Sequence, residues 1–206
     1  MLTLQAPHSR AESTVTVNVT RMALNATIFK ATLQIADMDR NYYQDHALTI
    51  ARHPSETDER MMVRLLVFAL HAHEALSFGK GLSNQDEPDL WQKDLTGVVE
   101  LWIEVGQPDE KSIRKACNRA KQVLIYTYGG RIADLWWDQN SSKLERANNL
   151  AVMNLPLDTS RALAKLAQRS MQLHCTIQDG QIWLADNKET VQVELTMVKT
   201  PSTPLR

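Results

Sequence analysis

Three acidic residues surround a stretch of the sequence that has the pattern of a β-hairpin. Asp89 begins the first β-like run, 89 to 95, and Glu100 and Glu104 lie in the second, 98 to 105. A two-residue turn between these runs places Asp89 opposite Glu104, with their Cβ atoms about 5 Å apart. Two carboxylates at that distance repel each other unless a proton or cation lies between them, and Mg²⁺ prefers oxygen ligands. The spacing therefore predicts a magnesium site at one end of the hairpin.

The register of this hairpin decides which side chains share a face with the acids. A turn on the Thr-Gly pair between the runs places Trp91 opposite Trp102 and Lys93 opposite Glu100. A bulged turn with its glycine in the left-handed region would shift this register. The alternative interpretation is a solvated face with an ordinary ion pair, on which the tryptophans belong either to the core or to a base-stacking platform.

Other chemistries are disfavoured by the residues present. His71 and His73 are two apart on a predicted helix, so they point in different directions and do not make a zinc pair. Cys117 and Cys175 belong to no CxxC motif, which argues against a disulfide framework or a zinc site. The sequence also lacks a Gly-x-Ser-x-Gly elbow and a glycine-rich phosphate loop.

A long helix is predicted after Pro54, with Ser55 as its N-cap and acids in its first turn. Its apolar residues recur at a spacing of three and four along one face, at Met62, Leu65, Leu66, Ala69 and Leu70. Counting back three positions from this stripe reaches Glu59. We therefore expect Glu59 to be largely buried at the sheet-facing start of the helix.

A second helix is predicted after Gly106 and Pro108, with Asp109 and Glu110 at its start. Its exposed side carries four basic residues, Lys111, Arg114, Lys115 and Arg119. A short β run at 123 to 128 follows, so residues 55 to 128 read as helix, hairpin, helix and strand.

The flanking segments add further elements. A hairpin is predicted over 26 to 52, and Asp179 and Gly180 separate two β-rich runs in the strongest hairpin signal of the chain. Between these hairpins, helices are predicted near 132 to 140 and 158 to 166, with a strand near 150 to 155, and a last strand covers 191 to 198.

Length and composition favour one intracellular domain. The chain has 206 residues, 43% of them hydrophobic, and its 23 basic and 24 acidic residues nearly cancel, so no chain-wide charge points to nucleic acid or a membrane. We expect a mobile tail at 1–21, a single α/β domain at 22–199 and a frayed end at 200–206. Without a signal peptide or apolar span, a cytoplasmic protein is expected.

Four long segments resemble the YaeQ family of bacterial proteins: MALNATIFKATLQIADMDR (22–40), ARHPSETDERMMVRLL (51–66), ELWIEVGQPDEKSIRKA (100–116) and TIQDGQIWL (176–184). The resemblance implies a variant of the PD-(D/E)xK restriction-endonuclease-like superfamily. The expected fold is α/β, with a mixed sheet whose core is helix, three-stranded meander, helix and strand, plus N-terminal and C-terminal β-hairpins.

The same resemblance assigns roles to individual residues. Asp89 after Pro88 matches the first superfamily motif, and Glu104-Val105-Gly106 falls at (D/E)xK with glycine in place of lysine. Lys115 is the best replacement for that lysine, and Glu59 matches the helix acid that some superfamily members add to the metal site.

Two functions follow as hypotheses. In the first, a Mg²⁺-dependent nuclease acts on DNA or RNA, with Asp89 and Glu104 as metal ligands, Glu59 or Glu100 as a supporting acid and Lys115 orienting water or phosphate. At least one supporting acid should then share the cation with both ligands. In the second, the protein is a non-catalytic regulatory or nucleic-acid-binding relative that contacts phosphate through Lys111, Arg114, Lys115 and Arg119.

Overall fold

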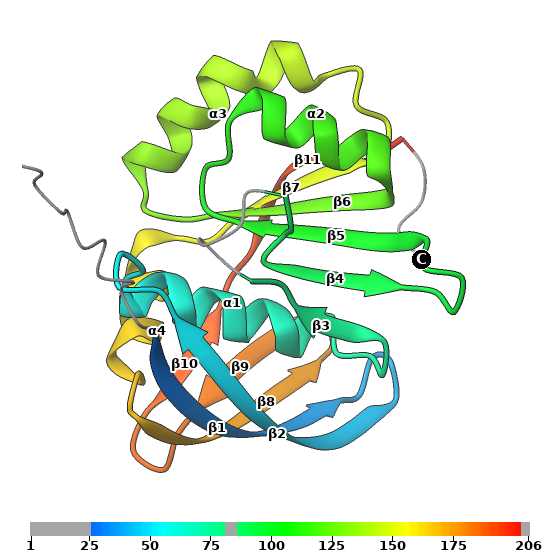
Figure 1. Ribbon diagram of the computed structural model, residues 1–206. Helices are drawn as coiled ribbons and strands as arrows, with labels where there is room; N and C mark the ends of the chain where they lie inside the picture. The colour runs from blue at the N-terminus through cyan, green and yellow to red at the C-terminus, as the bar shows by residue number, and fades with distance from the viewer. Residues whose placement is uncertain (1–25, 81–85, 203–206) are drawn as a thin grey trace, which may run out of the picture.

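The computed structural model describes residues 26–80 and 86–202 (Figure 1). The helices of this part are α1 (Asp58–Leu70), α2 (Glu110–Arg119), α3 (Arg131–Leu144) and α4 (Leu157–Lys165). Its strands are β1 (Thr27–Asp37), β2 (Tyr42–Arg52), β3 (Leu76–Phe78), β4 (Leu90–Lys93), β5 (Val99–Val105), β6 (Ala120–Thr127), β7 (Leu150–Asn154), β8 (Ser170–Gln178), β9 (Gln181–Ala185), β10 (Thr190–Val193) and β11 (Thr196–Lys199).

The strands form two mixed sheets. One has the order β10-β9-β8-β1-β2, and the other has the order β11-β7-β6-β5-β4-β3. The two terminal hairpins that the sequence predicts do not extend the meander sheet. They pair with each other instead, because β1 runs parallel to β8, and so they build a sheet of their own.

Helices α1 and α4 lie between the two sheets, and α2 and α3 cover the far face of the second sheet (Figure 1). The larger core cluster combines the inner faces of both sheets with α1 and α4, and the smaller cluster lies under α2 and α3. Residues Met61 to Ala69 of α1 are buried without a break. A helix packed between two sheets has no solvent face, which explains why its apolar side is wider than a single stripe.

The start of α1 differs from its prediction. Thr57 is the N-cap, and its hydroxyl accepts a hydrogen bond from the Arg60 N–H at 3.1 Å. The assignment of Ser55 as the cap is therefore wrong, since the helix begins at Asp58. This shift leaves Glu56 ahead of the helix, where its side chain turns into the interior.

The β4–β5 hairpin has the expected register over most of its length. Trp91 pairs with Trp102, as predicted, but a bulge before Lys93 pairs this residue with Val99, so its predicted pairing with Glu100 is wrong. The turn explains the shift, because its glycine has a φ of 88°, in the left-handed region. Since the bulge lies at the turn end, the pairing at the opposite end keeps the predicted alignment.

The segment from α1 to β6 has the predicted order of helix, hairpin, helix and strand. The short strand β3 precedes the hairpin and pairs antiparallel with β4, which makes a three-stranded meander. Helix α2 then connects β5 to the parallel strand β6. Helix α2 starts where the sequence predicts, with Asp109 as its N-cap.

The C-terminal part confirms one turn and corrects one strand. Asp179 and Gly180 have φ values of 52° and 73°, as the tight turn between β8 and β9 requires. The single strand predicted for 191–198 is wrong, because β10 joins the first sheet and β11 joins the second. The predicted tail at 1–21 and the last four residues of the predicted frayed end lie outside the described residues.

No helix within 26–80 and 86–202 is both long and apolar enough to cross a membrane.

The C-terminal end of α1 is tied to the first hairpin by Arg40. Its Nε donates to the buried carboxylate of Asp37 at 2.5 Å, and its Nη atoms donate to the carbonyls of Ala69 and Ala72, each at 3.4 Å. We expect Arg40→Leu to lower the free energy of unfolding by about 2 to 4 kcal/mol, because it leaves a buried carboxylate unpaired. Urea denaturation measures the change.

The matched control is Arg114→Leu, which removes an exposed ion pair and should cost less than about 1 kcal/mol. Equal losses in the two variants would show that Arg40 does not tie the hairpin to α1.

Candidate functional site

The candidate site lies at one edge of the second sheet, where the parallel strands β5, β6 and β7 end. The start of α1 approaches this edge from the layer below (Figure 1). Ends of parallel strands are the usual place for ligand sites in open α/β sheets, because the connecting loops and helix starts converge there. The site therefore gathers side chains from the start of α1, from the residue before β4 and from the end of β5.

Four charged side chains form a buried network at this edge. Arg64 donates through Nε and Nη2 to the two carboxylate oxygens of Glu56, at 2.7 and 2.8 Å. Arg60 donates through Nη1 to Glu56 at 2.9 Å and through Nη2 to both oxygens of Asp89, each at 2.8 Å. Glu56, Arg64 and Asp89 are only 5%, 2% and 2% exposed. Buried charges persist only when paired and hydrogen-bonded, and this chain of contacts satisfies all four.

Asp89 is fixed to the end of β5 as well as to α1. Its Oδ2 accepts the Val105 N–H at 2.8 Å, and its own backbone N–H donates to the Ile103 carbonyl at 3.1 Å. Two hydrogen bonds from Arg60 and one from the Val105 N–H therefore hold the carboxylate in one position. This fixed position confirms that the start of the hairpin brings Asp89 to the end of β5.

Glu104 lies beside Asp89 and is half-buried. Burial, together with the negative charge of Asp89, raises the pKa of Glu104 to about 7, against the lowering effects of the Trp102 hydrogen bond and of Arg60. The Trp102 indole N–H donates to Glu104 Oε1 at 2.7 Å. The two carboxyl groups thus interact electrostatically, as the hairpin register predicts, and Glu104 holds a proton for about half of the time at neutral pH.

The predicted supporting acids do not join this pair. Glu59 is half-buried and accepts a hydrogen bond from Ser160 Oγ of α4 at 2.6 Å. The expectation that Glu59 is largely buried against the sheet is therefore wrong: the acid turns toward the neighbouring helix. Glu100 forms an ion pair with Lys121 of β6 at 2.6 Å, because β6 is its parallel neighbour.

Consequently, three carboxylates do not converge on one point. In the described part of the chain, no group of three His, Cys, Asp or Glu side chains is arranged to hold a metal ion. The histidines lie elsewhere: His71 Nε2 is 2.6 Å from the Tyr126 hydroxyl, and burial together with the charge of Arg40 lowers its pKa to about 4.

The carboxyl groups of Asp89 and Glu104 are still chemically suited to bind a divalent cation, because both offer the oxygen ligands that Mg²⁺ prefers. Glu104 would first have to release its proton. Asp89 would have to share an oxygen that Arg60 now contacts. A cation at this edge would therefore compete with a proton and with a guanidinium.

Gly106 occupies the position at which the resemblance predicts a lysine. Its φ is 108°, a backbone conformation that residues with a side chain rarely adopt, although a Cβ would find open space there. A lysine at this position would therefore strain the backbone at the end of β5.

Lys115 is paired with an acid outside the network. Its ammonium pairs with Asp86, on the segment that leads into β4. The hydrogen bond and charge of Lys115 lower the pKa of Asp86, and Arg119 contributes in the same direction. Lys115 and Arg119 thus line the side of α2 that faces this segment.

Arg114 points to the opposite side of α2. It pairs with Glu110 at 2.8 Å, and Glu110 also lies 3.5 Å from Lys143 of α3. The four basic residues predicted as one phosphate-binding set are therefore divided between two edges of the helix, with Lys111 exposed at its start.

Sequence analysis missed the arginines of the network. The signal was present, because Glu56, Arg60 and Arg64 are spaced by four residues and Arg64 interrupts an otherwise apolar run. Charged residues at that spacing share one face of a helix, and an arginine amid buried residues requires a partner. Their partner Asp89, by contrast, is distant in sequence and is placed only by the tertiary fold.

Glu104→Gln tests the protonation of the site. The folded pKa of about 7 exceeds the ordinary value of 4.5, so the folded protein binds more protons than the unfolded chain between these values. Its free energy of unfolding should fall as the pH rises through this window. The variant keeps an oxygen for the Trp102 indole, should lose this dependence and should be about 2 to 3 kcal/mol more stable than wild type at about pH 8.

Urea denaturation at about pH 5 and about pH 8 measures the difference, because the two proteins should converge at the lower pH. The same loss of stability with rising pH in both proteins would contradict the assignment of the proton to Glu104.

Comparison with known proteins adds the family. Residues 22–195 match the family model described as YaeQ protein. The chain is 49% identical over 181 residues to the uncharacterized protein YaeQ of Escherichia coli (strain K12), covering 88% of this chain and all of that protein. The Salmonella typhi protein of the same description is 48% identical over 181 residues, with the same coverage of both chains.

Two solved structures are similar throughout. The crystal structure of YaeQ protein from Xanthomonas axonopodis pv. citri has a TM-score of 0.81 and 48% identity, over 85% of this chain and 99% of that one. The YaeQ protein from Pseudomonas syringae has a TM-score of 0.81 and 35% identity, over 86% and 98%. The chain therefore belongs to the YaeQ family.

Proposed function

We propose that the protein is a metal-dependent nuclease-like enzyme that hydrolyses phosphodiester bonds in DNA or RNA at the edge formed by Asp89 and Glu104. The observation that carries this proposal is the closeness of the two carboxyl groups, at which the charge of Asp89 raises the pKa of Glu104. Paired carboxylates at a sheet edge are the usual oxygen ligands of Mg²⁺ in phosphoryl-transfer sites.

The order of elements supports the same proposal. Helix α1, the meander β3, β4 and β5, helix α2 and strand β6 follow the order of the PD-(D/E)xK core, with β5 parallel to β6. The resemblance places the first motif acid on one strand of that core and the second acid on the next strand. Asp89 immediately precedes β4, and Glu104 is the penultimate residue of β5.

Each residue of the edge has a distinct task in this proposal. Asp89, fixed by Arg60 and by the Val105 N–H, provides a preorganised negative charge. Glu104, once it has released its proton near neutral pH, provides the second carboxylate that holds the cation. A bound Mg²⁺ would supply a lowered water pKa and neutralise charge on the phosphate. Lys115 would exchange Asp86 for a phosphate oxygen when substrate binds.

A second candidate is a non-catalytic nucleic-acid-binding or regulatory protein of the same fold. The specific observation in its favour is that Arg60 already neutralises Asp89, with one nitrogen 2.8 Å from both carboxylate oxygens. In such a protein the guanidinium would replace the cation, and phosphate would be held by the basic residues of α2.

Cleavage assays decide between the two. The purified protein with Mg²⁺ or Mn²⁺ should nick or degrade at least one of single-stranded or double-stranded DNA and RNA. Asp89→Asn and Glu104→Gln should each lower the rate by about a hundredfold or more, because each removes a charge that holds the cation. Lys115→Ala should slow cleavage about tenfold or more and leave metal affinity nearly unchanged.

The control is Glu74→Gln, which removes an exposed carboxylate beyond the C-terminal end of α1, the end of the helix opposite this edge, and should cleave at the wild-type rate. If the wild-type protein cuts none of the substrates with either metal but binds one of them in a salt-sensitive manner, the non-catalytic candidate replaces the nuclease.

A further inference from the structure

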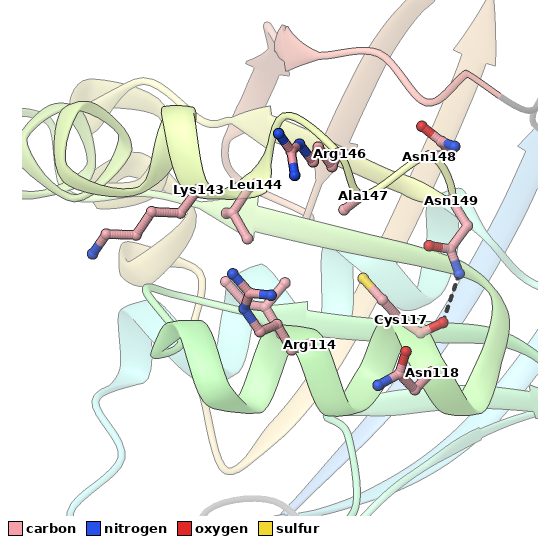
Figure 2. Close-up of a pocket in the computed structure, with 10 residues that line it drawn as sticks. Arg114, Cys117, Asn118, Lys143, Leu144, Arg146, Ala147, Asn148 and Asn149 are labelled. Atoms are coloured by element: carbon pink, nitrogen blue, oxygen red, sulfur yellow. Dashed lines mark hydrogen bonds between the residues drawn. The ribbon is translucent and has the colours of Figure 1, made fainter.

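A basic groove lies between α2 and the end of α3. It has a volume of about 280 Å³, and Arg114 and Cys117 rise from α2 toward the segment that carries Leu144, Arg146 and Ala147 (Figure 2). This volume is just below the range of about 300 to 1,000 Å³ that is usual for small-molecule sites. The groove is therefore of a size for a small ligand or for one unit of a chain.

The charge of the groove is positive. Arg114, Lys143 and Arg146 line it, and its lining contains no carboxylate. Beside the groove, Glu110 contacts both Arg114 and Lys143, and the Lys199 ammonium donates to the Ala147 carbonyl at 3.0 Å, so cations outnumber acids around it. Arg146 has no ion pair with any residue of the described part of the chain and is exposed.

Part of the groove lining is an apolar wall. It consists of Ile113 and Leu144, which are buried, and Ala147, which is half-buried. Ligand sites commonly combine such a surface with a few charged groups that fix orientation. The ligand that fits both features has a charged end and an apolar body.

We propose that this groove binds a phosphate monoester attached to a nucleoside, either a free nucleotide or the phosphorylated end of a nucleic-acid strand. A monoester carries a charge of about −1.5 to −2 near neutral pH, so a groove surrounded by several cations favours it over a singly charged group. A carboxylate or an internal phosphodiester carries only one. The arginine forks on facing walls suit the paired oxygens of a phosphate, and a nucleoside would cover the apolar wall.

The groove is separate from the carboxylate edge. Its wall segment leads into β7 at Leu150, which pairs with Val123 near the start of β6, whereas Asp89 and Glu104 lie at the end of β5. Helix α2 spans the distance between the two ends of the sheet. The proposal therefore goes beyond the nuclease-like activity and does not require it.

Cys117 provides a readout inside the groove. The chain has two cysteines, and both are free, but Cys175 is only 1% exposed whereas Cys117 lines the groove. Burial raises the pKa of Cys117, so alkylation is best measured at alkaline pH. Saturating adenosine monophosphate should slow the alkylation of Cys117 about tenfold, and adenosine should protect it much less. An unchanged rate with saturating nucleotide would overturn the proposal.

Charge-removing variants test the arginines. Arg146→Gln and Arg114→Gln should each weaken binding of adenosine monophosphate about tenfold in calorimetry, because each loses a charged hydrogen-bond donor. The matched control is Arg119→Gln, an exposed arginine of the same helix that does not line the groove, which should bind within about twofold of wild type. Equal losses in all three variants would indicate a diffuse charge effect and contradict a built site.

Two further arms identify the source of the phosphate. An oligothymidylate with a terminal phosphate should bind more tightly than the same strand without the phosphate. If a strand end is the ligand, the phosphorylated strand should also bind more tightly than adenosine monophosphate. Inorganic phosphate should bind more weakly than either. Asp89→Asn should leave all these affinities unchanged, so failure of the nuclease proposal can be distinguished from failure of the groove to bind phosphate. Absence of any preference for the phosphorylated strand or nucleotide would refute the groove proposal.

Discussion

The contact between Arg60 and Asp89 is the interaction on which the candidate site depends. Arg60 sits in the first turn of α1 and reaches an aspartate that precedes β4, and the same guanidinium contacts Glu56. Because Asp89 and Glu56 are buried, neither can lose this partner without a large desolvation penalty. The contact therefore fixes the start of the helix, which lies between two sheets, to the edge of one of them.

The charges of this edge explain the unusual state of Glu104. Three carboxyl groups, those of Glu56, Asp89 and Glu104, face only two guanidinium groups, those of Arg60 and Arg64. One negative charge is left over in a partly buried place, and a proton on Glu104 is the least costly way to neutralise it. A divalent cation would neutralise the same excess. At this edge a proton and a cation would therefore compete for the same negative charge.

Local signals in the sequence predicted much of this fold. The Asp-Gly turn, the first hairpin and the order of elements between α1 and β6 follow from short-range periodicity and turn residues. The alignment of Asp89 with the end of β5 also followed, because the bulge that displaces Lys93 lies at the turn end of the hairpin. By contrast, the first sheet depends on β1 pairing with β8, and no local pattern indicates a contact between segments that far apart in sequence.

The candidate site was predictable to a similar degree. The hairpin register predicted that Asp89 and Glu104 would be paired, but the contacts of the other two acids were not predicted. Glu59 accepts a hydrogen bond from Ser160 on α4, and Glu100 forms an ion pair with Lys121 on β6. Such partners come from the packing of distant elements. The central claim is that Arg60 holds the position that a cation would take at Asp89. Calorimetric titration of Mn²⁺ into Arg60→Gln tests it most directly. Arg52→Gln is the control for the loss of one positive charge. Mn²⁺ should bind about tenfold more tightly to Arg60→Gln than to wild type and with wild-type affinity to Arg52→Gln. Unchanged or weaker binding in Arg60→Gln would show that Arg60 does not hold the position of a cation.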